Sequence, residues 1–227
     1  MTDFIMEIPP LQRLLTAYAP KKMREEQQIL WAFDMRMAEI VRSTYEPMLG
    51  QIRFAWWREA LSGEKEAAGV GDPLMDALRA RVLPNAGAAG LLEAIEGWEV
   101  LLEPLPLSDW QLVRFAEHRG GGLYRTIGQL SGPYPPWLSQ AGMGWALWDL
   151  SGHVSDSDMA RRSVALAREC LADVPVRGWP DTLAPLKILS GLVRRDVENN
   201  RTAPARMNWR QYRQLLWLGL RRRKGEA

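Results

Sequence analysis

The apolar residues of this 227-residue chain recur at spacings of three and four positions almost throughout, and this periodicity limits what the chain can fold into. Between residues 23 and 42, Ile29, Phe33, Met37 and Ile40 fall on one face of a helix that turns about 100° per residue. The alternation of apolar and polar residues that is typical of strands is almost absent. Prolines stand where the periodic segments begin or end, as expected at helix boundaries. The pattern predicts an all-α fold.

The periodic segments divide the chain into a series of predicted helices. We expect them near residues 10–18, 21–43, 47–62, 73–83, 88–102, 107–118, 122–131, 136–151, 157–173, 181–199 and 208–223. Neither an internal repeat nor a linker long enough to separate two domains interrupts the series. We therefore predict one domain over residues 1–227, with Gly- and Pro-containing surface connections at 62–72 and 132–136.

Several classes of site are disfavoured by composition. One cysteine, Cys170, excludes an intramolecular disulfide and suits a reducing compartment. His118 and His153 are isolated in the sequence, so we expect both to be structural or surface residues rather than zinc ligands or members of a catalytic triad. The N-terminus lacks the basic and apolar regions of a secretory signal, and no apolar run is long enough to cross a membrane. The expected location is the cytoplasm.

The charges are unevenly distributed. Residues 201–227 contain eight Lys or Arg and one Glu, a net charge of +7, although the whole chain carries only +2. We predict a basic amphipathic helix at about 208–224 that either closes the core or docks on an anionic surface peripheral to the inner membrane. The docking residues would be Arg221, Arg222, Arg223 and Lys224. The 11 tryptophans recur at helical spacing, which indicates core packing and gives no sign of a nucleic-acid partner.

Three stretches resemble members of the squalene/phytoene synthase family in their order along the chain. They are YAPKKMREEQQILWAFDMRMAEIVRS (18–43), EPMLGQIRFAWWREALSG (46–63) and the small-residue segment GGGLYRTIGQLSG (120–132). The resemblance implies an isoprenoid-synthase-like helical bundle around a central cavity, with the third stretch lining that cavity. It also implies the family chemistry, the head-to-head joining of two isoprenoid diphosphates by Mg²⁺ ions held on two acidic motifs.

Both acidic motifs of the family are incomplete in this chain. On the first, the family's aspartates fall on Ala38 and Arg42, and only Glu39 is acidic. On the second, the Asn-x-x-x-Asp pattern falls near Ser151 and Ser155. We expect Ser155 and the acid three residues after it to form a helix N-cap instead of a metal site. No cofactor is therefore expected, and Mg²⁺ would be needed only if the chain were an enzyme.

The same strip of the 21–43 helix supplies candidate binding residues. Asp34 shares it with Trp31 and Arg42, and a buried Asp34 would need a cationic partner, for which Arg42, Arg53 and Arg58 are the candidates. These three arginines could alternatively form a metal-free anion site. Trp56 falls on the predicted core stripe with Leu49, Ile52 and Ala60, whereas Trp57 either lines a cavity mouth or packs in the core. The predicted substrate-binding set is Trp31, Arg42, Arg53, Trp57 and Arg58.

Three functions follow from these patterns. The first is a non-catalytic member of the family that binds an isoprenoid or another lipid, or that serves in assembly, as does a mitochondrial respiratory complex I assembly factor of the same superfamily. The second is an active prenyl transferase with a rearranged site of Asp34, Glu39, Asp149 and Asp156, which must face one another across a cavity. The third is a helical adaptor without a small-molecule site.

Overall fold

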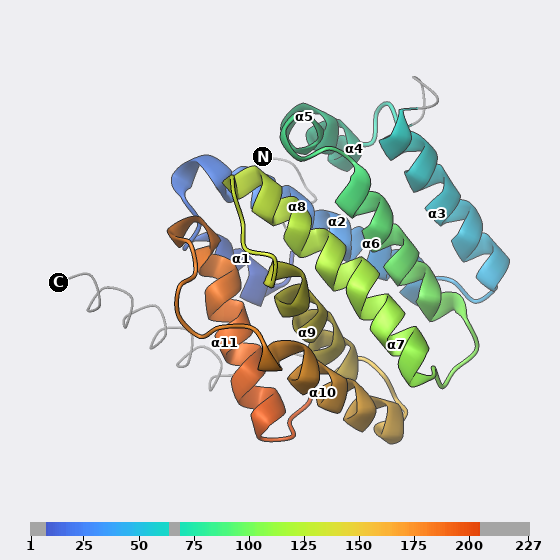
Figure 1. The fold of residues 1–227 in the computed structure, drawn as a ribbon. Helices are drawn as coiled ribbons and strands as arrows, with labels where there is room; N and C mark the ends of the chain where they lie inside the picture. The colour runs from blue at the N-terminus through green and yellow to red at the C-terminus, as the bar shows by residue number, and fades with distance from the viewer. Residues whose placement is uncertain (1–7, 64–68, 205–227) are drawn as a thin grey trace.

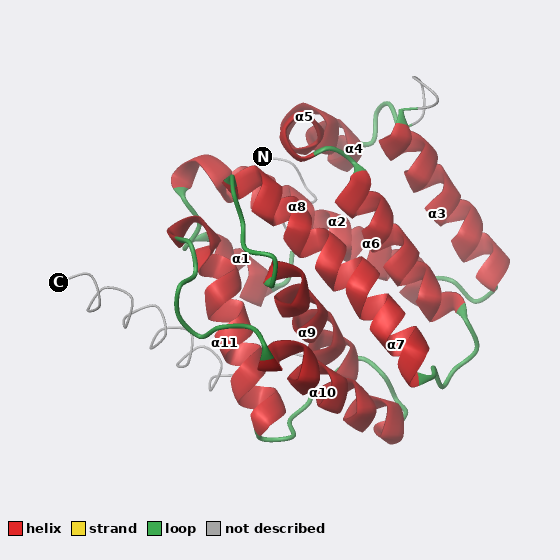
Figure 2. Ribbon diagram, in the orientation of Figure 1, coloured by secondary structure: helices red, strands yellow, loops and turns green. Residues whose placement is uncertain are grey.

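The computed structural model describes residues 8–63 and 69–204, and all regular structure in these two ranges is helical (Figures 1 and 2). The prediction of an all-α fold is confirmed. The principal helices are α1 (Pro10–Thr16), α2 (Arg24–Arg42), α3 (Pro47–Ser62), α4 (Pro73–Ala77), α5 (Leu83–Ala86), α6 (Ala89–Glu99), α7 (Asp109–Phe115), α8 (Gly122–Ser131), α9 (Leu138–Ser151), α10 (Ser157–Ala172) and α11 (Ala184–Glu198). Short 3₁₀ segments are η2 (Lys21–Met23), η4 (Val100–Leu102) and η6 (Asp181–Leu183), and π-helical segments are η3 (Leu78–Val82) and η5 (Ala116–Gly121).

Helix α9 lies at the centre of the bundle. It packs against α10, η5, α8 and α11, and Figure 1 shows α10 and α11 on one side of it and α8 on the other. Its tryptophans Trp145 and Trp148 are almost fully buried. The buried apolar residues, from Ile8 to Ala203, form one continuous cluster around it. A helix that is apolar on all sides is expected in such a central position.

The predicted helices 107–118 and 122–131 are continuous, because η5 joins α7 directly to α8. The three glycines at 120–122 lie inside this continuous helix, where they allow close packing. A Cβ on Gly120 would lie 2.1 Å from the carbonyl oxygen of Gly142 in α9, and one on Gly122 would lie 2.5 Å from that of Gly90 in α6. Only glycine permits helices to approach this closely. The glycines therefore hold η5 tightly between α6 and α9.

Helix α3 buries a different set of residues from the one predicted. Trp57 is buried with 3% of its surface exposed, and Trp56 is 38% exposed. The predicted core stripe was wrong at Leu49 and Ile52 as well, which are exposed while Gly50 packs inward, and it was right only at Ala60, which is 1% exposed. The helix carries apolar residues on both faces, so periodicity alone could not select the buried one. Contacts with α2 and α6 decide it: Trp57 packs against Phe33 with ring centroids 5.8 Å apart.

Two further predictions concern membrane-spanning helices and the C-terminal segment. In the described residues no helix has the length and apolar character needed to cross a membrane. The predicted basic helix at about 208–224, with Arg221, Arg222, Arg223 and Lys224, lies outside the described residues. The last described segment, 203–204, returns to the end of α9, where the backbone N–H of Ala203 donates to Ser151 Oγ over 3.2 Å.

Candidate functional site: a pocket above a buried ion triad

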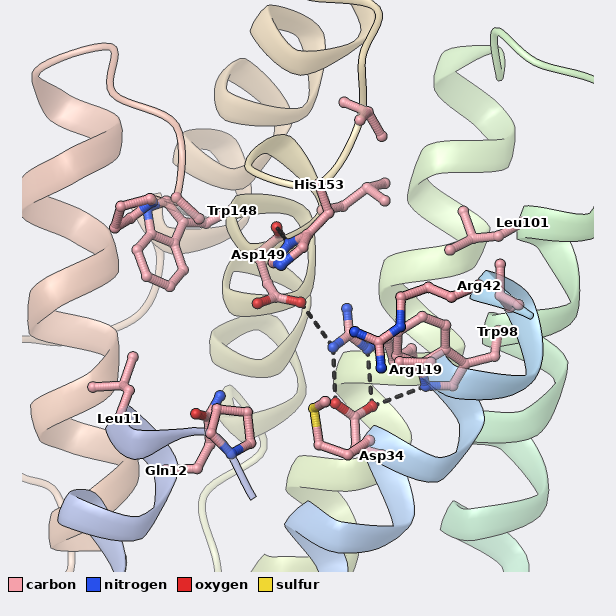
Figure 3. A pocket seen from close by; sticks show the side chains of 18 of the residues that line it. Leu11, Gln12, Asp34, Arg42, Trp98, Leu101, Arg119, Trp148, Asp149 and His153 are labelled. Carbon is pink, nitrogen blue, oxygen red and sulfur yellow. Dashed lines mark hydrogen bonds and ion pairs between the residues drawn. The ribbon is translucent and has the colours of Figure 1, made fainter. Parts of the chain in front are cut away.

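A pocket of about 630 Å³ opens between α1, α2, α6, η5 and the end of α9 (Figure 3). Most of its wall is apolar. The apolar lining includes Leu11, Leu101, Leu105, Trp148, Leu150, Val154 and Met159. Its volume falls within the range of roughly 300–1,000 Å³ that is usual for small-molecule sites. The pocket is open to the outside, and polar side chains are confined to a part of its lining.

Three charged side chains form the polar floor of the pocket. Arg119 donates from Nε to Asp34 Oδ1 over 2.9 Å and from Nη2 to Asp34 Oδ2 over 2.8 Å. The same Nη2 lies 2.9 Å from Asp149 Oδ2. Figure 3 shows the guanidinium between the two carboxylates, with Asp34 on α2, Arg119 on η5 and Asp149 on α9. We call Asp34, Arg119 and Asp149 the ion triad.

Aromatic rings fix the position of Arg119. Its guanidinium carbon lies 4.0 Å from the ring centroid of Trp98 and 4.6 Å from that of Trp145, distances at which a cation is attracted to the ring face. The indole N–H of Trp98 also donates to Asp34 Oδ1 over 2.9 Å. Gly97 makes room for this arrangement, because a Cβ there would lie 2.4 Å from the backbone nitrogen of Arg119.

Burial and charge act in opposite directions on Arg119. Burial by itself lowers the pKa of a guanidinium, but the adjacent carboxylates of Asp34 and Asp149 outweigh it and hold the Arg119 pKa above its ordinary value. Arg119 is 3% exposed and Asp34 4% exposed, so both charges are removed from water and depend on each other. The bidentate geometry is the strongest form of such a pair.

Asp149 differs from the other two members of the ion triad because its side chain is 22% exposed. Its Oδ2 bonds to Arg119, whereas its Oδ1 accepts no hydrogen bond from the described residues. His153 lies above it at the exposed rim, with Nδ1 2.8 Å from the backbone oxygen of Asp149. Arg42 is also at the rim, where it pairs with Glu39 over 2.5 Å. A molecule entering the pocket therefore meets Asp149 before the other two.

Only some of the acids proposed for a rearranged catalytic site come together. Asp34 and Asp149 meet at Arg119. Glu39 is exposed and does not line the pocket. Asp156 is the N-cap of α10 and accepts from the backbone N–H of Met159 over 2.6 Å. The predicted N-cap was therefore one residue too early, and four acids do not face one another across the pocket.

The predicted substrate-binding residues are also dispersed, apart from Arg42. Trp31 is buried against Trp145, with ring centroids 5.2 Å apart, and Trp57 lies in the core. Arg53 is exposed and donates to Ser43 Oγ over 2.9 Å, and Arg58 pairs with Glu99. The structure therefore corrects the predicted three-arginine site, because the partners of Arg53 and Arg58 lie outside the pocket.

Sequence reasoning identified Asp34 as a residue that needs a cation but missed the cation itself. Arg119 stands 85 positions away, and nothing around it except the adjoining triple glycine sets it apart from the other arginines. The expected partners Arg42, Arg53 and Arg58 all lie within 24 positions of Asp34 in the sequence. A buried ion pair between distant helices is visible only once the helices have been placed.

The donor set of the floor does not fit the magnesium ions that the family resemblance implies. Both carboxylates that converge are bound by a buried guanidinium, which repels a divalent cation. Ala38 and Ser151 supply no carboxylate, and Ser151 Oγ bonds instead to the backbone of Trp148 and Ala203. Within residues 8–63 and 69–204, no group of three or more His, Cys, Asp or Glu side chains could hold a metal ion.

Comparison of the chain with protein-family models, with curated proteins and with solved structures found no match. The candidate function therefore depends on the pocket and on the sequence resemblance to the squalene/phytoene synthase family.

Proposed function

We propose that the protein is a non-catalytic member of the squalene/phytoene synthase superfamily that binds an isoprenoid or another lipid chain in the pocket. One observation carries the proposal: the pocket has an apolar wall, and the charges at its floor already neutralise one another in part. The transfer of an apolar chain from water to such a wall is favourable by a free energy of roughly 25 cal/mol per Å² of buried apolar surface. A helical adaptor without a small-molecule site would not need a pocket of this size.

The position of Arg119 supports binding over catalysis. The family reaction needs carboxylates that are free to hold metal ions, which in turn hold the diphosphates. In this chain the guanidinium occupies the space between Asp34 and Asp149 and engages both. The prenyl transferase hypothesis retains one favourable observation, the convergence of these two acids on facing helices. An assembly role, which the resemblance also implies, would concern a protein partner and would not require the pocket.

Calorimetric titration with farnesol tests the proposal. We expect binding by the unaltered protein and at least a tenfold loss in the Ala38→Phe variant, because Ala38 lines the pocket and a phenyl group would fill part of it. The matched control is Ala55→Phe, since Ala55 is exposed on α3 and does not line the pocket. Equal binding by both variants, or none by the unaltered protein, would contradict the proposal.

An enzymatic assay tests the alternative. The purified protein is incubated with farnesyl diphosphate and Mg²⁺, and the release of diphosphate is measured. We expect no release above that from a heat-denatured sample. Release that depends on Mg²⁺ and is lost in Asp149→Asn would establish the prenyl transferase instead.

A further inference from the structure

The polar part of the pocket lining offers hydrogen-bond acceptors to a ligand, together with one buried donor that has no partner among the described residues, the indole Nε1 of Trp148. Asp149 offers its Oδ1, whereas Arg119 and Asp34 are covered, with 4% and 5% of their side chains exposed. Gln12 also lines the pocket and is 8% exposed, and its Oε1 is buried with no partner among the described residues. Buried polar atoms are normally satisfied, so the Gln12 oxygen calls for a donor, while the partly exposed Asp149 Oδ1 is free to accept one. Figure 3 places Gln12 and Asp149 on different helices around the same hollow.

The net charge of the pocket floor also favours a hydrogen-bond donor over an anion. Two carboxylates and one guanidinium leave the ion triad with a formal charge of −1 in a largely apolar surrounding. Electrostatic interactions are stronger there than in water, so an anion beside Asp149 is repelled. Arg42 does not offset this charge, because it lies at the rim and pairs with Glu39. The only other ionisable group in the lining is His153, which is exposed.

We infer that the pocket selects a lipid whose polar end donates hydrogen bonds, a hydroxyl or an ammonium group, over one that ends in a diphosphate. The inference rests on the proposed function, because it assigns the head group of the ligand that the apolar wall would hold. The head group donates to Asp149 Oδ1, and its chain lies along the leucine-rich wall. The preference is opposite to that of an enzyme that binds isoprenoid diphosphates through metal ions.

Three probes with the same farnesyl chain separate head-group preference from chain binding. Farnesylamine, farnesol and farnesyl diphosphate are titrated into the full-length protein in buffer that contains a metal chelator. We expect farnesylamine and farnesol to bind and farnesyl diphosphate to bind at least about 100-fold more weakly, since like charges at close range cost several kcal/mol. Tightest binding of the diphosphate would overturn the inference and leave the proposed function standing. Binding of none of the three would overturn the proposed function itself.

An Asp149→Asn variant tests the residue assigned to the head group. Asn keeps an oxygen acceptor but removes the charge, so we expect farnesylamine to bind about 10- to 100-fold more weakly and farnesol to change less than about threefold. Arg119 keeps its bidentate partner Asp34, and a thermal melt of the variant verifies the fold. The matched control is Asp173→Asn, which makes the same change of charge at an exposed residue outside the pocket lining. An equal effect of the two substitutions on farnesylamine would refute the role of Asp149.

Discussion

Replacement of Arg119 by methionine should destabilise the fold far more than the loss of an ordinary ion pair. Methionine has a similar length and keeps much of the contact with Trp98 and Trp145, but it cannot neutralise Asp34, which is 4% exposed. Leaving one charge of a buried pair without its partner costs about 3–5 kcal/mol. In a domain of this size each kcal/mol lowers the melting temperature by about 2–4 °C, so we expect a fall of roughly 10 °C.

The assay is urea unfolding followed by circular dichroism, with two companion variants. The double variant Asp34→Asn/Arg119→Met should recover most of the lost free energy, because it removes the orphaned charge as well. Arg114→Met is the matched control, since Arg114 and Glu103 form a half-exposed pair 3.6 Å apart that should contribute less than about 1 kcal/mol. The deficit of Arg119→Met should also shrink as the pH falls, because a protonated carboxyl is cheaper to bury than a carboxylate.

Two outcomes would refute this reasoning. The first is a loss of less than about 1 kcal/mol in Arg119→Met, which would mean that Asp34 is adequately solvated without its partner. The second is a double variant no more stable than Arg119→Met. In that case the contribution of Arg119 would come from packing against the indole rings rather than from charge.

Three further predictions concern packing and reactivity. Trp57→Ala should lower the free energy of unfolding by about 3–5 kcal/mol, whereas Trp56→Ala next to it should cost about 1 kcal/mol or less, because only Trp57 is buried; similar losses in urea unfolding would show that the faces of α3 are misassigned. Gly120→Ala should cost about 1–3 kcal/mol, since its Cβ would meet a backbone carbonyl, while Gly121→Ala, whose one tight contact is the end of an arginine side chain, should be neutral or slightly stabilising; thermal melts that rank the two in reverse order would contradict this. Burial raises the pKa of Cys170 to about 11, so at pH 8 iodoacetamide should modify the folded protein about 100-fold more slowly than the urea-unfolded chain, at a rate that rises as the pH approaches 11; equal rates for the two states would contradict it.

The helices were predictable because each depends on neighbours in the sequence. Periodicity, prolines at the first turn and Asp or Ser caps act over three or four residues, so the segments near 24–42 and 157–172 could be placed closely. The continuity of α7 with α8 could not be predicted, because consecutive glycines indicate a helix end unless another helix is known to pack against them.

The site was less predictable than the helices, since its geometry depends on which helices meet. Asp34 and Asp149 were both identified as candidates, and they do converge. Their shared partner Arg119 was missed, because the pairing of distant residues is decided by packing rather than by local pattern. The prediction of the buried face of α3 was wrong for the same reason. Trp56 and Trp57 are chemically identical neighbours, and they are distinguished by the packing of α3 on α2 and α6, where Trp57 contacts Phe33.

The pocket is bounded by segments from both ends of the described chain, Pro9 to Gln12 on one side and Ala203 with Pro204 on the other. A hollow assembled from such distant segments exists only when the described domain has folded, because bringing segments about 190 residues apart together closes a long loop. A molecule held there would contact both of these segments at once. Its binding would therefore oppose global unfolding, and it would also oppose local separation of these two segments from the rest of the domain.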